Sequence, residues 1–329
     1  GGPVPDPGSL DSGADSMPPV ARRAVVTGAF SYIGSAVASE LLARGWTVHT
    51  LTNRHPPAEG GAVTHAPLLF DADHLARELH DADLFVNTYW IRFPHEGETF
   101  DSAVEHGRML VAAAVRARVG RLVHVSVSNA AADSGLGYYV GKARLDDAVR
   151  AAGLPHAIVR PTLVVGSSDV LTSNVAWCLR RFPVFLLPRG GRYRLQPVTL
   201  ADTGRIVADA AEAQVDLDVD AAGPTTLTFA DFVRLLARAI GVRRLLLGAP
   251  DGVALAALKA VGWFLRDVVL TREELEGLAQ ERLVSHRPPL GRESVEDWIL
   301  AHGETLGRRY VNDLDRHVGR ERTTPILAP

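Results

Sequence analysis

Between Ala24 and Arg160, short β-branched runs alternate with longer amphipathic segments. This alternation is typical of repeated strand-helix-strand units, which build a parallel sheet with helices on both faces. The runs expected as strands are 24–26, 46–51, 63–68, 84–86, 122–125 and 156–159. Segments with apolar residues three and four apart, expected as helices, are about 35–44, 72–80, 99–118 and 138–152. The pattern predicts an α/β fold with a doubly wound parallel sheet.

The pattern changes after Pro161, where proline- and glycine-containing loops precede several further helical stretches. A chain of 329 residues exceeds the roughly 250 to 300 residues at which single cores stop growing, so a second lobe is expected. We expect a disordered tail or expression remnant at 1–19, a sheet domain at 20–165 plus 195–215, and a smaller, mostly helical C-terminal lobe at 166–194 and 216–329.

Composition narrows the class of partner. A formal net charge of -3 provides no basic field for nucleic acid, so a small-molecule ligand is expected. The single cysteine, Cys178, fits a reducing compartment, and we expect a cytoplasmic protein. No stretch is long and apolar enough for stable membrane insertion, although peripheral contact stays open. The twelve histidines show no metal-binding spacing, and monomer and homodimer both remain open.

A glycine-containing turn follows the first expected strand and leads into the first helix, over Thr27–Gly34. Gly28 permits a tight turn, Gly34 permits close packing of helix on sheet, and the helix N-terminus offers N–H groups to a pyrophosphate. Ser31 replaces the middle glycine of the usual triplet, and its hydroxyl could bond a phosphate oxygen or cap the helix. The placement predicts a Rossmann dinucleotide site with the following loop residues: Gly28, Phe30, Ser31, Tyr32, Ile33 and Gly34.

The end of the second strand indicates which dinucleotide is bound. A carboxylate here would accept hydrogen bonds from the ribose of NAD, but the sequence is Leu51-Thr52-Asn53-Arg54. Arg54 is placed to pair with a 2′-phosphate, or it is a solvated loop arginine. We therefore expect NADP(H) in preference to NAD(H), with Asn53 nearby. Asp71, after the third strand, could bind the adenine amino group or cap a helix.

Two residues with a four-residue spacing carry the expected chemistry. Tyr138 and Lys142 share one face at the start of a predicted helix, and a nearby ammonium should lower the pKa of the Tyr138 phenol from about 10 toward the working pH. Lys142, one of only two lysines in the chain, could also bond the nicotinamide ribose. Ser128, after the fifth strand, is expected to polarise a substrate carbonyl, and Ser126 to serve the cofactor through its backbone; both could instead be ordinary turn serines.

Together these motifs resemble an extended or atypical short-chain dehydrogenase/reductase. The resemblance runs from about residue 22 to 212 and includes Arg160-Pro161-Thr162 and Gln196–Asp202. Within that family the chain is most similar to the NAD-dependent epimerase/dehydratase-like group, which includes the NADPH-binding accessory subunit of respiratory complex I.

The resemblance implies a role for each matching residue. It makes Tyr138 the general acid/base, Lys142 its activator and Ser128 the carbonyl partner, with Pro161 and Thr162 beside the nicotinamide. In sugar-nucleotide epimerases an arginine before the late motif grips the nucleotide phosphates; Leu195 stands there in this sequence, and Arg194 is shifted by one position.

Bulky residues follow the fourth strand, where such folds have small residues beside the cofactor. Asn87 and Thr88 are expected at the cofactor, and Tyr89 and Trp90 at a flat or apolar substrate, although aromatic residues also pack in cores. From the second lobe, Asn174, Trp177 and Arg194 are the candidate substrate contacts. The apolar stretch 254–270 could be a membrane-surface helix or a buried element of that lobe.

The sequence therefore predicts an NADP(H)-dependent oxidoreductase that transfers hydride to or from a carbonyl or alcohol carbon of a small, largely apolar substrate. Two alternatives remain open. One is a redox-neutral epimerase, dehydratase or isomerase, and the other is a non-catalytic dinucleotide-binding sensor or assembly protein.

Overall fold

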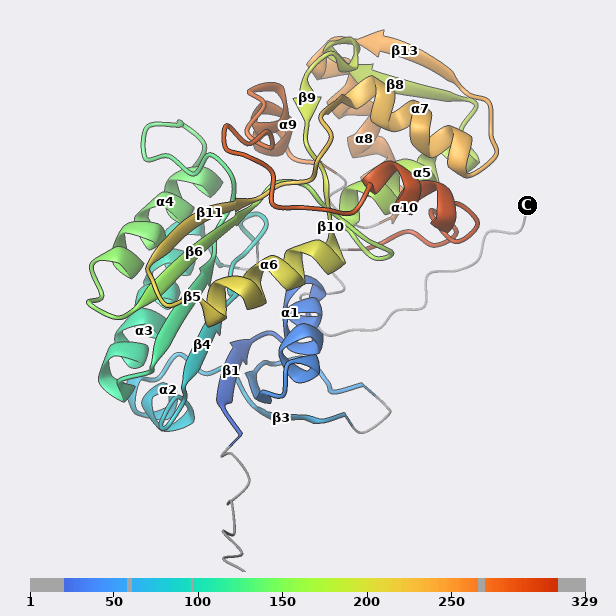
Figure 1. Ribbon diagram of the computed structural model, residues 1–329. Coiled ribbons are helices and arrows are strands. Elements are labelled where there is room, and N and C mark those ends of the chain that lie inside the picture. Colours follow the sequence, from blue (N-terminus) through green and yellow to red (C-terminus); the bar gives the residue numbers. More distant parts are fainter. Residues whose placement is uncertain (1–20, 58–60, 96, 266–269, 313–329) are drawn as a thin grey trace, which may run out of the picture.

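The computed structural model describes residues 21–57, 61–95, 97–265 and 270–312 (Figure 1). The N-terminal tail expected at 1–19 lies outside the described residues.

The centre of the molecule is a seven-stranded, wholly parallel sheet with the strand order β11-β6-β5-β4-β1-β2-β3. The strands are β1 (Arg23–Thr27), β2 (Thr47–Leu51), β3 (Val63–Ala66), β4 (Leu84–Asn87), β5 (Arg121–Val125), β6 (His156–Pro161) and β11 (Leu217–Ala221). The order in which strands are added to the sheet reverses between β1 and β4, the place at which doubly wound sheets bind ligands. The predicted fold class and the six expected strands are confirmed.

Helices cover both faces of this sheet (Figure 1). On one face, α1 (Tyr32–Ala43) packs with α6 (Leu200–Glu212) over a core of small and β-branched side chains that includes Val26, Val37 and Val207. The other face carries α2 (Ala72–Glu78), α3 (Phe100–Ala117) and α4 (Gly137–Arg150). The four helices expected between strands are therefore confirmed, with α1 beginning three residues earlier than predicted.

The C-terminal lobe has its own core, formed by residues such as Leu179, Phe232, Leu236 and Ile299. Its helices are α5 (Val170–Arg181), the single turn η1 (Arg189–Gly191), α7 (Phe229–Ala239), α8 (Asp251–Leu265), α9 (Arg272–Ala279) and α10 (Val295–His302). Three short strand pairs accompany them: β7 (Val164–Val165) with β10 (Val198–Thr199), β9 (Arg194–Leu195) with β12 (Leu227–Thr228), and β8 (Val184–Pro188) with β13 (Leu245–Ala249).

One expected domain boundary is corrected. Residues 217–221, predicted to lie in the second lobe, form β11 and pair with β6 as the seventh strand of the sheet. Their alternation of apolar and acidic residues contains no β-branched run. The acidic side chains have partners elsewhere in the chain: Asp218 pairs with Arg150, Arg160 and Arg287, and Asp220 accepts a hydrogen bond from the Ser285 hydroxyl. Within the described residues, no helix has the length and apolar character needed to cross a membrane.

Candidate active site

A cleft of about 520 Å³ opens at the carboxyl ends of β1 and β4. Its walls come from the β1–α1 turn, the segment after β4, the first turn of α4, the segment after β6, and α9. Ligands of doubly wound sheets bind at this edge, so the cleft is the candidate site for a dinucleotide and its substrate.

The β1–α1 turn fits a dinucleotide. Gly28 has a φ of +67°, a conformation that favours glycine, and a Cβ on Gly34 would lie 2.0 Å from the carbonyl oxygen of Gly28. Both positions therefore require glycine for the helix to approach the strand. Ser31, Tyr32 and Ile33 line the cleft at the N-terminus of α1, where N–H groups and the helix dipole favour a phosphate.

Ser31 does not take the capping role that was one expectation for its side chain. Its hydroxyl makes no cap bond to α1 and donates a hydrogen bond to the carbonyl oxygen of Gly28 at 2.5 Å, within the turn.

Of the other residues expected at the adenosine, one lines the cleft and three make contacts elsewhere. Arg54 lines the cleft. Asn53 instead joins the ends of β2 and β3, because its side chain bonds both the N–H and the carbonyl of Leu68. Asp71 accepts from His74 N at 2.8 Å as the cap of α2, and Phe30 meets the ring of His65.

Two of the residues expected at the cofactor are threonines that line the cleft. Thr88 and Thr162 both line it, and their hydroxyls donate to the carbonyl oxygens of Thr27 and Gln196. Asn87 and Pro161 lie behind this wall: Asn87 is fully buried and accepts from Tyr89 N at 3.0 Å, and Pro161 pairs with β11.

Tyr138 lines the cleft at the start of α4. Its backbone N–H donates to Glu273 Oε1 at 2.8 Å, and its ring meets the edges of Trp90 and Phe100. The expected fall in the pKa of the Tyr138 phenol is wrong: burial raises that pKa, as does the negative charge of Glu274, and Arg92 opposes the rise only in part. The phenol is consequently protonated at neutral pH.

Trp90 lies between Lys142 and the cleft. The indole lies against α4 so closely that a Cβ on Gly141 would be 2.7 Å from it, and the Lys142 ammonium sits 4.8 Å from its ring centre. Lys142 is 3% exposed, is absent from the cleft lining and donates to the carbonyl oxygen of Val125 at 2.9 Å. Burial lowers the pKa of Lys142 to about 7.

A buried ionic cluster lies behind Lys142. Asp146 accepts from Arg160 at 2.9 Å, and burial, opposed by Arg160, raises the pKa of the Asp146 carboxyl. His124 is fully buried beside them, and its pKa is held well below the ordinary value, first by burial and then by the positive charges of Lys142 and Arg160. The imidazole is therefore neutral.

Ser128 does not face the cleft. Its hydroxyl donates to the carbonyl oxygen of Arg282 at 2.7 Å, and Asn129 donates to the carbonyls of Arg282 and Val284. The segment after α9 thus covers the residues that follow β5. Among Ser126, Val127 and Ser128, Val127 lines the cleft. Ser126 contributes its N–H to Val159, inside the sheet.

Of the five expected substrate residues, the structure brings only Trp90 to the cleft. Tyr89 lies 2.9 Å from His106 and points to the α3 side; Trp177 packs on Tyr310; Arg194 pairs with Glu281 at the surface. Asn174 lines a neighbouring cavity and bonds the backbone of Val311. The other four residues lie in the expected loop or lobe, but their side chains contact other protein residues and do not reach the cleft.

The far wall of the cleft was missed from the sequence. It is α9, whose Glu274 binds Arg92 with contacts of 2.5 and 3.2 Å and also completes the capping box with Thr271. Thr271 and Glu274 could have revealed the start of this helix by their three-residue spacing. No pattern links them to Arg92, which is 182 residues away. Across the described parts of the chain, no group of three or more His, Cys, Asp or Glu is arranged to hold a metal ion.

Residues 24–183 match the family described as NAD dependent epimerase/dehydratase. This segment, 160 of the 329 residues, carries the similarity to that family. The family domain extends from β1 through α5 to the start of β8, so most of the C-terminal lobe lies outside the matched segment. The family resemblance expected from the sequence is confirmed.

Individual proteins extend this comparison. The chain is 24% identical over 270 residues to the mitochondrial NADH-ubiquinone oxidoreductase 40 kDa subunit of Neurospora crassa, covering 78% of this chain and 70% of that protein. It is 30% identical over 166 residues to the ceramide reductase of Caulobacter vibrioides, about half of each chain (48% and 51%). The solved structure of the NADPH-dependent quinone oxidoreductase QOR2 from Escherichia coli, complexed with NADPH, has a TM-score of 0.69 at 18% identity, covering 85% and 99% of the two chains.

Proposed function

We propose that this protein is an NADP(H)-dependent oxidoreductase that transfers hydride to or from the carbonyl or alcohol carbon of a small, largely apolar substrate. One observation carries the proposal: the ring of Tyr138 lines the same cleft as Arg54 and the N-terminus of α1. A proton donor and the elements that suit a dinucleotide thus share one cleft.

In this proposal the cofactor is held by the β1–α1 turn and by Arg54. The N-terminal N–H groups of α1 bind the pyrophosphate, and Arg54 forms charge-assisted hydrogen bonds with the 2′-phosphate. Thr88 and Thr162 line the remaining cofactor side. The nicotinamide supplies or accepts the hydride when the cofactor is bound.

Tyr138 is the group that moves the proton. Because its phenol is protonated at neutral pH, it can donate a hydrogen bond and then its proton to the oxygen of a carbonyl that is being reduced. Donation leaves a phenolate on Tyr138, which must be reprotonated from solvent before the next turnover. The name of the ceramide reductase relative supports reduction as the working direction.

Lys142 and Ser128 act as positioning residues in this proposal. Lys142 supports the indole of Trp90 from behind, so that Trp90 forms the floor beside Tyr138. Ser128 holds the Arg282 segment over the end of β5. The aromatic residues Trp90, Phe93 and Phe100 give the cleft its apolar character.

The same placement of Lys142 and Ser128 favours a second candidate, a dinucleotide-binding protein without turnover. Neither side chain lines the cleft, so the usual Ser-Tyr-Lys arrangement is not assembled around it.

The test is NADPH oxidation with a panel of apolar ketones and quinones, using the wild type, Tyr138→Phe and, as matched control, Tyr89→Phe, whose hydroxyl lies outside the cleft beside His106. We expect Tyr138→Phe to lose about 10² to 10⁴ in kcat while NADPH affinity is retained, and Tyr89→Phe to keep most activity. Equal activity of Tyr138→Phe and wild type would refute the acid role. Binding of NADPH with no oxidation by any acceptor would favour the second candidate.

A further inference from the structure

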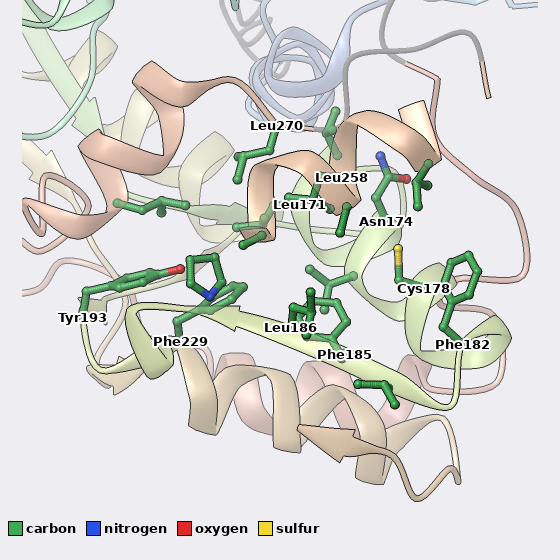
Figure 2. Close-up of a pocket in the computed structure, with 18 of the residues that line it drawn as sticks. Leu171, Asn174, Cys178, Phe182, Phe185, Leu186, Tyr193, Phe229, Leu258 and Leu270 are labelled. Atoms are coloured by element: carbon green, nitrogen blue, oxygen red, sulfur yellow. The ribbon is translucent and has the colours of Figure 1, made fainter. Parts of the chain in front are cut away.

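A second cavity, the lobe chamber, lies in the C-terminal lobe between α5, β8 and α8 (Figure 2). Its volume is about 420 Å³, which is in the range of about 300 to 1,000 Å³ typical of ligand sites.

The wall of the lobe chamber is almost entirely hydrocarbon. It includes Leu171, Phe185, Leu186, Phe229, Leu258 and Val261.

Three polar side chains, Asn174, Cys178 and Tyr193, line this wall, and none of them is charged, because burial also raises the pKa of the Tyr193 phenol. The Asn174 amide is taken up by both backbone groups of Val311, with bonds of 3.1 and 2.9 Å. Burial raises the pKa of the Cys178 thiol to about 12, so it is neutral. A charged ligand would lose its hydration here without a countercharge to replace it, whereas a hydrocarbon loses nothing.

The lobe chamber adjoins the candidate active site. Four residues, Val170, Leu171, Leu270 and Leu278, line both the chamber and the cleft that contains Tyr138. All four are aliphatic, so the wall that the two spaces share is hydrocarbon. At one end of the chamber, away from Tyr193 and Phe229 (Figure 2), Phe182 is 39% exposed. A ligand could therefore extend toward solvent there.

We infer that the lobe chamber binds the aliphatic chain of the substrate whose carbonyl end lies beside Tyr138. The inference rests on the proposed function for the position of the carbonyl, and it specifies the substrate class as an amphiphile with a long alkyl, acyl or isoprenoid chain. Burial of each methylene contributes enough to tighten binding about fourfold, so a chain of several carbons dominates recognition.

The test uses the full chain and a series of methyl ketones of increasing alkyl length. Cys178 is the sole cysteine and lines the chamber, so the rate of its modification by methyl methanethiosulfonate, followed by intact mass, reports occupancy without any turnover. We expect the half-protecting concentration to fall about fourfold per methylene until the chamber is filled. The kcat/KM for NADPH oxidation should rise with the same chain-length dependence.

Variants locate the effect. Leu186→Trp, which fills the chamber, should move the plateau to shorter ketones, and Leu186→Ala should move it to longer ones. The matched control, Val115→Trp on the exposed outer side of α3, should leave the plateau unchanged.

Three results would decide against this account. Protection independent of chain length, or a plateau unaffected by both Leu186 variants, would overturn the inference. Protection that follows chain length while kcat/KM stays flat would also overturn it, because the chain and the reacting carbonyl would then belong to different ligands. If no ketone is reduced but protection still follows chain length, the proposed reaction fails and the hydrocarbon site stands.

Discussion

Lys142 should make the stability of the protein rise with pH in the alkaline range. Its side chain is fully enclosed between Trp90 and the carbonyl oxygen of Val125, and burial lowers its pKa from 10.5 to about 7, with Asp146 opposing the shift. Replacing Lys142 with methionine keeps an unbranched chain of similar length and removes the titrating group, so Lys142→Met isolates this contribution.

The sign follows from proton counting. Between about pH 7 and 10.5 the unfolded chain holds a proton on Lys142 that the folded chain has released. The unfolding free energy therefore rises with pH in this window, by up to about 1.4 kcal/mol per pH unit, and the gain is lost as pH falls through 7. The interval between the two pKa values corresponds to about 5 kcal/mol in total.

Urea unfolding of the wild type and Lys142→Met at several pH values from 7 to 9.5, followed by tryptophan fluorescence, measures this term. The unfolding free energy of the wild type minus that of the variant should increase by about 1 kcal/mol or more per pH unit. The other lysine, the exposed Lys259 on α8, provides the control, and Lys259→Met should show no such trend. A difference for Lys142→Met that stays flat would show that the ammonium retains an ordinary pKa and that Trp90 does not enclose it.

Two further substitutions test the walls of the cleft. Gly34→Ala places a Cβ 2.0 Å from the Gly28 carbonyl oxygen. The substitution should therefore lower the unfolding free energy by about 1 to 3 kcal/mol and weaken NADPH binding. Unchanged NADPH affinity in calorimetry would refute the role of this turn. Glu274→Gln removes the charge that pairs with half-buried Arg92. This substitution should lower the unfolding free energy by about 1 to 2 kcal/mol and raise the KM for the substrate. Kinetics and unfolding equal to those of the wild type would show that α9 does not form a wall of the substrate site.

The sheet domain could be predicted from the sequence because its signals are local. A β-branched run, a helical period and the glycine turn at Gly28 and Gly34 each act within a few residues of the chain. The strand β11 was missed because Asp218 and Asp220 interrupt its apolar residues, and the arginines and the serine that hold them come from other parts of the chain.

The site was predicted less completely, since its geometry depends on contacts between distant segments. The spacing of Tyr138 and Lys142 places them on the same helix face, but it cannot show that Trp90, from the segment after β4, lies against that face. Likewise, the carbonyl that occupies the Ser128 hydroxyl belongs to Arg282, 154 residues away. Both deviations arise from packing, which the periodicity of the sequence does not encode.

Calorimetric titration of the cofactor-stripped protein with NADPH and then NADH, at fixed salt, tests the central claim most directly. We expect NADPH to bind more tightly than NADH, and Arg54→Ala to remove about tenfold or more of the NADPH affinity while leaving NADH binding unchanged, because charged hydrogen bonds contribute about 1.5 to 3 kcal/mol. Failure of both nucleotides to bind at millimolar concentration would show that the β1–α1 turn is not a working dinucleotide site and would contradict the proposed reaction.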